Sequence, residues 1–366
     1  MNKKILLIGN SGLKHNYGDG QTAKVRLYFK KIHDEGFDVV FVDLEDFSRR
    51  PFSVFQKIKK GIAECDRIVL ISASRGCKIL IPFINRNNRK FNKPFILPLI
   101  GTSVLHSSLD KLSEEDKVDF LVNGNYSLCK QDKKTAKQLK KITYILPETG
   151  LLVKVFKEYY KLDNVFLLNN FRDFCLIKKE NVSSDVLTLI FLSRVTKIKG
   201  IFDLLEVTKA LIDEGHKLKL DIYGNKMLSH DEEMLLDSYI DGVNVNYCGA
   251  IDNDMVCETI SHYNLFVFPT RYLGEGTPGV LAESLIAGTP ILSSDFPQAK
   301  YILNNGNETI FYNMFDKEDL KNKLQNLIDD KIQLIELQKK AMIAGEGFTF
   351  KHERRVFLKY ICGKAE

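Results

Sequence analysis

The sequence predicts an α/β protein made of two doubly wound, Rossmann-like domains that face a central cleft. Short apolar runs rich in β-branched residues alternate with longer amphipathic runs along most of the 366 residues. The strand-like runs are apolar almost throughout, which is typical of parallel sheets covered by helices on both faces. The alternation begins at the amino terminus and begins again near residue 186, which indicates two domains.

The first domain is expected to span residues 1–170. Its predicted strands are KILLIG, FDVVFVD, DRIVLIS, FILPLIG, DFLVNG, ITYIL and NVFLLN, and a helix with the sequence TAKVRLYFKKIHDEG is expected to end at Gly36. A polar, irregular segment, 171–185, is the predicted linker.

The second domain is expected to span residues 186–345. Its predicted strands are LTLIFLS, KLKLDIYG, NVNYCG, NLFVFP and TPILSSD, and IFDLLEVTKALIDEG is a predicted helix. The chain reads as helical after about Phe315. Residues 346–366 are expected to form a carboxyl-terminal helix that packs back toward the first domain.

The composition indicates a globular protein with two differently charged halves. Residues 1–170 carry 30 Lys+Arg against 18 Asp+Glu, an excess of +12, and the rest carries an excess of −6, which together give the net charge of +6. Either the charges are ordinary solvated helix faces, or the basic half faces an anionic membrane or acceptor. Seven cysteines without a C-x-x-C pair, and no apolar run of about 18 residues, favour a cytoplasmic protein with at most peripheral contact at the inner face of the cytoplasmic membrane.

The stretch EGTPGVLAESLIAGTPILSSD predicts a helix start between two carboxylates. Thr277 fits the N-cap and Pro278 the first helical position, while Gly288 fits the left-handed position that ends the helix. Free amides near Gly276–Val280 would attract an anion such as a diphosphate. The competing interpretation is an ordinary helix start with surface glutamates.

Two further constellations follow predicted strands. Arg194 and Lys199 in LSRVTKIKG could neutralise a diphosphate, although either could be an ordinary surface cation. The loop GNSGLKHNYGDGQT lets the backbone approach a ligand closely, but it matches neither the G-x-G-x-x-G nor the P-loop pattern.

Taken together, these features resemble the family 4 glycosyltransferases, retaining enzymes of the GT-B fold that serve bacterial polysaccharide assembly. The likeness rests on the E-x7-E pair Glu275 and Glu283, on Arg194 and Lys199, and on the glycine loop, and it is most specific around residues 190–295. LLNNF and VNYCGAI add to it. Such enzymes move a sugar from a nucleotide diphosphate, here expected to be UDP, to a glycan or lipid-linked acceptor in capsule, lipopolysaccharide or exopolysaccharide synthesis.

The resemblance implies a role for each matching residue. Glu275 would hold the donor sugar, Glu283 the ribose, and Arg194 and Lys199 the leaving diphosphate. The remaining donor-binding positions would be Gly12, Tyr223, Gly224, Tyr247, Ile251, Gly276, Thr277, Pro278, Gly279 and Val280. No residue acts as a nucleophile in this scheme, and catalysis is positioning plus charge stabilisation.

The first domain departs from the family pattern. Relatives carry a histidine directly after a first-domain strand, where this chain has Thr102 and Ser103, with His106 a few residues later. His106 is the catalytic candidate there, Thr102 and His15 are the alternatives, and a fourth possibility is that none of them takes the role. His15, Asn16, Thr102 and Ser103 are the predicted acceptor contacts.

No metal or other cofactor is expected. The histidines lack metal-binding spacing, and the D-x-D of Asp252–Asp254 is interpreted as a cap for a helix that begins near Asn253. Nucleic-acid binding is not indicated, because no basic run is interleaved with aromatic residues. The rival functions are a sugar-nucleotide epimerase of the same fold and a non-catalytic nucleotide or glycan binder.

Overall fold

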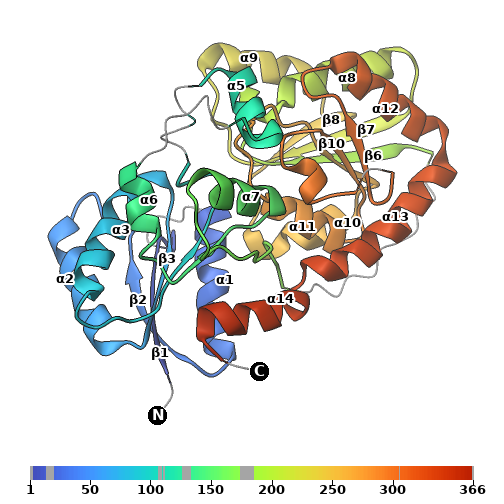
Figure 1. The fold of residues 1–366 in the computed structure, drawn as a ribbon. Coiled ribbons are helices and arrows are strands. Elements are labelled where there is room, and N and C mark those ends of the chain that lie inside the picture. Colours follow the sequence, from blue (N-terminus) through green and yellow to red (C-terminus); the bar gives the residue numbers. More distant parts are fainter. Residues whose placement is uncertain are drawn as a thin grey trace. The chain divides into compact units, whose positions relative to one another are not determined.

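The computed structural model describes residues 3–13, 20–105, 109, 112–125, 133–173, 185–304 and 306–364. Contacts divide the chain into two compact units (Figure 1). Unit 1 comprises Met1–Asn169 and Glu353–Glu366, and unit 2 comprises Asn170–His352.

Unit 1 contains a five-stranded parallel sheet in the order β2-β1-β3-β4-β5. The strands are β1 (Lys4–Gly9), β2 (Asp38–Asp43), β3 (Arg67–Ile71), β4 (Phe95–Pro98) and β5 (Tyr144–Leu146). The helices are α1 (Gly20–Asp34), α2 (Pro51–Glu64), α3 (Ser74–Asn88), α5 (Glu114–Val118), α6 (Lys133–Leu139) and α7 (Gly150–Tyr159). Ile5–Ile8 and Ile68–Ile71 are fully buried, as expected of central strands covered on both faces.

Unit 2 contains a six-stranded parallel sheet in the order β11-β10-β9-β6-β7-β8. Its strands are β6 (Leu187–Leu192), β7 (Leu218–Tyr223), β8 (Val245–Gly249), β9 (Leu265–Phe268), β10 (Ile291–Ser294) and β11 (Thr309–Tyr312). Its helices are α8 (Ile201–Asp213), α9 (His230–Tyr239), α10 (Val256–Ser261), α11 (Gly279–Ile286), α12 (Lys317–Asp329) and α13 (Lys331–Gly345). Both units are thus doubly wound parallel sheets, as predicted.

The carboxyl-terminal residues pack within unit 1 from Glu353 onward. Helix α14 (Phe350–Phe357) continues as a π-helix, Leu358–Cys362. Arg354 forms a two-pronged ion pair with Glu35, with N···O distances of 2.5 and 2.6 Å. Arg67 donates to the carbonyl oxygens of Tyr360 and Ile361, 2.7 and 2.9 Å away.

Two predicted strands are absent from the structure, and one strand was not predicted. Residues 119–124, predicted as a strand, form a π-helix (Asp119–Asn123) that continues α5, because Ser113 caps α5 by accepting from the Asp116 amide. Residues 164–169 form no strand beyond one bridge from Val165 to Ile145. Strand β11 was not predicted, because its four residues are flanked by polar segments.

None of the helices in the described ranges is long and apolar enough to cross a membrane.

Candidate functional site

The residues predicted to bind a donor gather at one edge of the unit 2 sheet. Arg194 follows β6, Gly224 follows β7, Ile251 follows β8 and Glu275 follows β9. Because neighbouring strands are parallel, their carboxyl ends lie along the same edge, which is where ligands bind in doubly wound sheets.

Lys199 and Glu275 form a buried ion pair at this edge. The Lys199 ammonium contacts Glu275 Oε1, and their side chains are only 9% and 8% exposed. The Thr270 hydroxyl donates to the same oxygen across 3.0 Å. The Lys199 ammonium also lies 5.7 Å from the ring centroids of Phe268 and Tyr272. Two side chains predicted to have separate roles are therefore in direct contact.

The backbone conformation of Gly200 positions Lys199 close to the end of β9. It ends the short 3₁₀ turn Lys197–Lys199 with φ of 76°, a left-handed conformation that favours glycine. A Cβ on Gly200 would lie 1.8 Å from the carbonyl oxygen of Pro269, so only glycine permits this close approach. The glycine thereby brings the turn after β6 against the end of β9, where the Glu275 loop begins.

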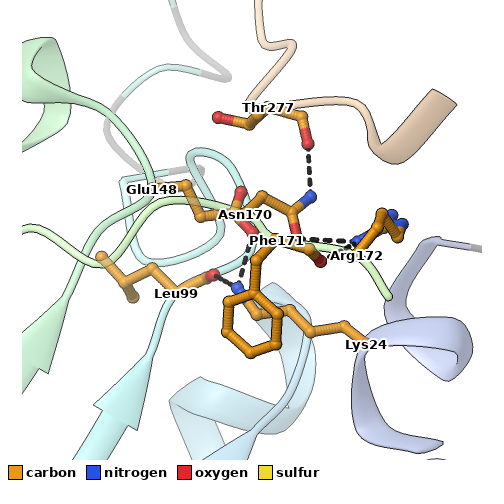
Figure 2. Close-up of polar contacts among 7 residues, drawn as sticks. All are labelled: Lys24, Leu99, Glu148, Asn170, Phe171, Arg172 and Thr277. Atoms are coloured by element: carbon orange, nitrogen blue, oxygen red, sulfur yellow. Dashed lines mark hydrogen bonds and ion pairs between the residues drawn. The ribbon is translucent and has the colours of Figure 1, made fainter. Parts of the chain in front are cut away.

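Helix α11 starts one residue later than predicted. Pro278 is the N-cap with φ −58° and ψ 129°, and no side chain caps the helix, so the prediction of Thr277 as N-cap is wrong. The carbonyl oxygen of Thr277 instead accepts from the Asn170 side chain across 2.7 Å (Figure 2). The predicted helix end is confirmed, since Ala287 is the C-cap and Gly288 has φ of 70°.

Glu283 pairs with an arginine that sequence reasoning missed. Arg172 Nε donates to Glu283 Oε1 across 2.8 Å, and the two side chains are 12% and 20% exposed. Arg172 Nη1 also donates to Asn170 Oδ1 and to the Phe171 carbonyl oxygen. Arg172 lies in the segment expected to be a linker, and nothing in its local pattern marks it as a site residue.

The remaining predicted donor residues of unit 2 lie at or after the carboxyl ends of β6, β7 and β8. Arg194 is exposed and makes no ion pair with any described residue. Tyr247 donates its hydroxyl to the carbonyl oxygen of Gly224 across 2.9 Å. A Cβ on Gly224 would lie 1.8 Å from the carbonyl oxygen of Ser193, which brings the ends of β6 and β7 together. Ile251 packs against the core cluster that contains α11.

The Tyr223 side chain is engaged inside the unit. Its hydroxyl lies 3.1 Å from the Tyr263 hydroxyl, which donates to Asp221 Oδ2 across 2.6 Å. Burial raises the pKa of both phenols, and for Tyr263 the hydrogen bond to Asp221 raises it further. Tyr223 is thus a neutral, hydrogen-bonded side chain at the end of β7, beside Gly224.

The D-x-D segment behaves only partly as predicted. Asp252 occupies the N-cap of the 3₁₀ turn Asn253–Met255, but its side chain makes no capping hydrogen bond. Within the described part of the chain, no three His, Cys, Asp or Glu side chains gather as they would to hold a metal ion.

Two of the predicted acceptor residues in unit 1 are buried. Thr102 and Ser103 are 5% and 8% exposed in the turns after β4. Gly12 has φ of 67° beside Ser11, whose hydroxyl donates to Asp43 Oδ2 across 2.5 Å. His15, Asn16 and His106 lie outside the described residues.

A second buried ion pair lies at the carboxyl edge of the unit 1 sheet. Lys24 of α1 contacts Glu148, which follows β5, with an N···O distance of 2.5 Å and side-chain exposures of 4% each. The same ammonium donates to the carbonyl oxygen of Leu99, after β4, across 2.9 Å (Figure 2). Neither residue stands out in the sequence, because each belongs to an ordinary amphipathic or polar run.

Comparisons with known proteins agree with this architecture. Residues 175–346 match the family model described as Glycosyl transferases group 1. The capsular polysaccharide biosynthesis glycosyltransferase CapM of Staphylococcus aureus is 24% identical over 161 residues, which cover 42% of this chain and 40% of CapM. The chain therefore spans well under half the length of that curated relative.

Solved structures resemble the whole chain. The Anabaena protein HepE in complex with UDP superposes with a TM-score of 0.72 at 12% identity, covering 99% of this chain and 100% of HepE. The lipopolysaccharide outer core galactosyltransferase WaaB gives a TM-score of 0.66 at 13% identity, covering 99% of this chain and 100% of WaaB. At these identities the likeness shows the fold, and the predicted GT-B fold is confirmed.

Proposed function

Since residues 175–346 match the family model described as Glycosyl transferases group 1, we propose that the protein is a retaining glycosyltransferase that uses a nucleotide-diphosphate sugar. The donor nucleotide is UDP, and the acceptor is a glycan or a lipid-linked saccharide. The reaction serves the synthesis of a cell-surface polysaccharide such as capsule, lipopolysaccharide or exopolysaccharide. The similarity to HepE, solved with UDP, to the capsular polysaccharide glycosyltransferase CapM and to the lipopolysaccharide galactosyltransferase WaaB supports these assignments.

The observation that carries the proposal is the buried contact of Lys199 with Glu275. Burying a lysine and a carboxylate costs desolvation free energy that their attraction barely repays, so we take the pair as a sign of a functional role. Here they stand at the ligand-binding edge of a parallel sheet, beside the start of α11. A donor would bring an anionic diphosphate for the lysine and sugar hydroxyls for the carboxylate.

The reaction requires charge stabilisation rather than a protein nucleophile. The bond between the anomeric carbon and the diphosphate oxygen breaks, and a bond to the acceptor hydroxyl forms on the same face. The acceptor proton passes to the leaving phosphate oxygen, so atoms and charges balance. Arg194, Lys199 and the amides of Gly279 and Val280 would stabilise the leaving diphosphate, and no metal ion is proposed for the chemistry.

The other contacts follow from the same placement. Glu275 would accept from hydroxyls of the donor sugar and Glu283 from the ribose. The backbone of residues 247–251 would contact the base. On the acceptor side, the proposed contacts are His15, Asn16, Thr102 and Ser103, with His106 near the reacting sugar.

Peripheral membrane contact is part of the proposal, and helix α2 supports it. Phe52, at the start of α2, is 82% exposed. Arg49 and Arg50, just before α2, and Lys57 and Lys59, within it, are exposed as well. An exposed apolar side chain on a helix that also exposes cations suits the headgroup region of an anionic bilayer, where each cation contributes roughly 1 kcal/mol. We propose that the protein acts in the cytoplasm, at the inner face of the cytoplasmic membrane.

Product analysis tests the transferase proposal. The protein is incubated with UDP-glucose, UDP-galactose or UDP-N-acetylglucosamine and a panel of p-nitrophenyl glycosides, and the new linkage is assigned by NMR. An α-linked product from these α-linked donors supports retention, and a β-linked product contradicts it. An epimerised donor in the absence of acceptor would instead favour the epimerase.

Two variants complete that experiment. Glu275→Gln should abolish most of the transfer. Lys321→Ala is the matched control, because it removes an ion pair between α12 and Glu214, the C-cap of α8, and should leave transfer unchanged.

A further inference from the structure

We propose that Arg172 is a positioning residue for ribose recognition. It holds the Glu283 carboxylate by one oxygen, so that the other oxygen stays directed to the ribose hydroxyls of a nucleotide donor. This inference rests on the proposed function, because it assumes that a ribonucleotide binds at the start of α11. It assigns a role to a residue outside the four charged side chains, Arg194, Lys199, Glu275 and Glu283, on which the proposed function rests.

The backbone around Arg172 is fixed on both sides. Its amide donates to the Phe348 carbonyl oxygen, and its carbonyl oxygen accepts from the Phe350 amide, both across 2.8 Å. These bonds form an isolated parallel bridge with Thr349. The Phe171 ring, 1% exposed, packs against Phe350 with centroids 5.2 Å apart. The arginine therefore starts from a rigid point of unit 2.

The guanidinium is fixed as well. Nε donates to Glu283 Oε1 across 2.8 Å, and Nη1 donates to Asn170 Oδ1 and to the Phe171 carbonyl oxygen at 3.0 and 2.9 Å. Asn170 in turn donates to the Thr277 carbonyl oxygen (Figure 2). The planar fork of an arginine, unlike a lysine, can keep these bonds at the same time. One short segment, Asn170–Arg172, thus ties the loop before α11 to a residue inside α11.

The third nitrogen lies against the first residue of α11. A Cβ on Gly279 would stand 1.4 Å from Arg172 Nη2, so the guanidinium occupies the space that any other residue at 279 would fill. The arginine therefore reaches the helix start itself, one helical turn from the carboxylate that it holds.

Only one of the two carboxylate oxygens of Glu283 accepts a hydrogen bond from a described residue. Its Oε1 accepts from Arg172, whereas its Oε2 makes no hydrogen bond with a described residue. The side chain is 20% exposed, so a ligand hydroxyl can approach it. A carboxylate already fixed in one rotamer loses less conformational entropy when it binds a ligand.

Charge gives a second reason for the pair. The proposed site receives a diphosphate at the start of the helix that carries Glu283. A lone carboxylate there would repel the diphosphate, and the arginine cation offsets that repulsion. Removing Arg172 should therefore lower the affinity for every nucleoside diphosphate. It should in addition reduce the preference for a ribose that carries both hydroxyls.

The test compares three nucleotides on one set of variants. UDP, 2′-deoxy-UDP and 3′-deoxy-UDP are titrated by calorimetry into the wild-type protein, Arg172→Met, Arg172→Lys and Lys321→Ala. The readout is the ratio of dissociation constants, deoxy-UDP over UDP, which does not depend on the fraction of folded protein. Thermal unfolding by circular dichroism checks that each variant is folded.

The expected wild-type ratio is about tenfold or more for at least one deoxynucleotide, as for a hydrogen bond to a charged group. Arg172→Met should lower it to about threefold or less. Arg172→Lys should restore the part of the affinity that is the same for all three nucleotides, because a lysine supplies the positive charge. It should not restore the ratio, because a lysine lacks the planar fork of donors. In a Glu283→Gln background, Arg172→Met should change the ratio no further, and Lys321→Ala should match the wild type.

Other results overturn the inference. A ratio unchanged in Arg172→Met would show that Arg172 is merely structural. Tighter UDP binding by that variant would show that Arg172 blocks the carboxylate. Full recovery of the ratio in Arg172→Lys would show that charge alone suffices. A wild-type ratio near one rejects this inference and leaves the proposed function standing, whereas no UDP binding by the wild-type protein rejects both.

Discussion

Lys199→Met removes one charge from the buried pair and keeps an apolar side chain of similar length. Glu275 then remains 8% exposed with the Thr270 hydroxyl as its remaining side-chain donor. Breaking a buried pair from one side costs about 3–5 kcal/mol of the free energy of unfolding. The Thr270 hydrogen bond survives, so we expect a loss near the lower end, about 3 kcal/mol.

The loss should be visible in thermal unfolding. For a unit of 150–250 residues, 1 kcal/mol corresponds to roughly 2–4 °C, so the Tm of the variant should fall by about 6–12 °C. The double variant Lys199→Met/Glu275→Leu should regain at least half of the lost stability, because no lone charge stays buried. Circular dichroism and scanning calorimetry of the three proteins measure both effects.

The same variant should bind UDP about 10-fold more weakly or worse, as expected when a charge-assisted hydrogen bond to phosphate is lost. A Tm within about 2 °C of the wild type, together with unchanged UDP affinity, would refute the placement of Lys199 in a buried pair that serves the donor.

Three further predictions concern other parts of the chain. Lys24→Met should cost about 3–5 kcal/mol in unfolding free energy, measured by urea titration, because it leaves Glu148 buried without its cation; a loss below about 1 kcal/mol would contradict the buried pair. Hydrogen bonds from backbone amides, that of Val245 foremost, lower the pKa of Asp241 to about 2 from 3.8. Its stabilising contribution is therefore complete above the unfolded pKa and is lost as the pH falls toward about 2, so the stability difference between wild type and Asp241→Asn should shrink over that window; a constant difference would argue against it. Cys248 is exposed and lies in the proposed base-binding stretch, so UDP should slow its alkylation by iodoacetamide, and equal rates with and without UDP would remove that stretch from the site.

The sequence predicted those parts of the fold in which local pattern and tertiary structure agree. The buried strands β1 and β6 are apolar almost throughout, and the end of α11 is marked by Gly288 and Pro290, so these three features were predicted correctly. The segment 119–124 has an equally apolar pattern but becomes helical, since the charged residues before it form a capped helix that runs on. Short apolar runs of this kind do not distinguish strand from helix.

The candidate site was predicted in part for a similar reason. The stretch around Glu275 and Glu283 has a recognisable spacing, whereas Arg172 acts through a contact 111 residues away along the chain. Lys24 reaches Glu148 across 124 residues. No local pattern encodes such long-range pairs, and only the packed units bring the partners together.

Nucleotide binding without metal tests the proposed donor site most directly. UDP, GDP, ADP, CMP and dTDP are titrated separately by calorimetry into the wild-type protein and into Lys199→Met and Glu283→Ala. We expect UDP to bind with a dissociation constant on the order of 1 μM, or about −8 kcal/mol, and both variants to weaken this binding at least about tenfold. No binding of any of the five nucleotides, or UDP affinity unchanged in both variants, would contradict this expectation.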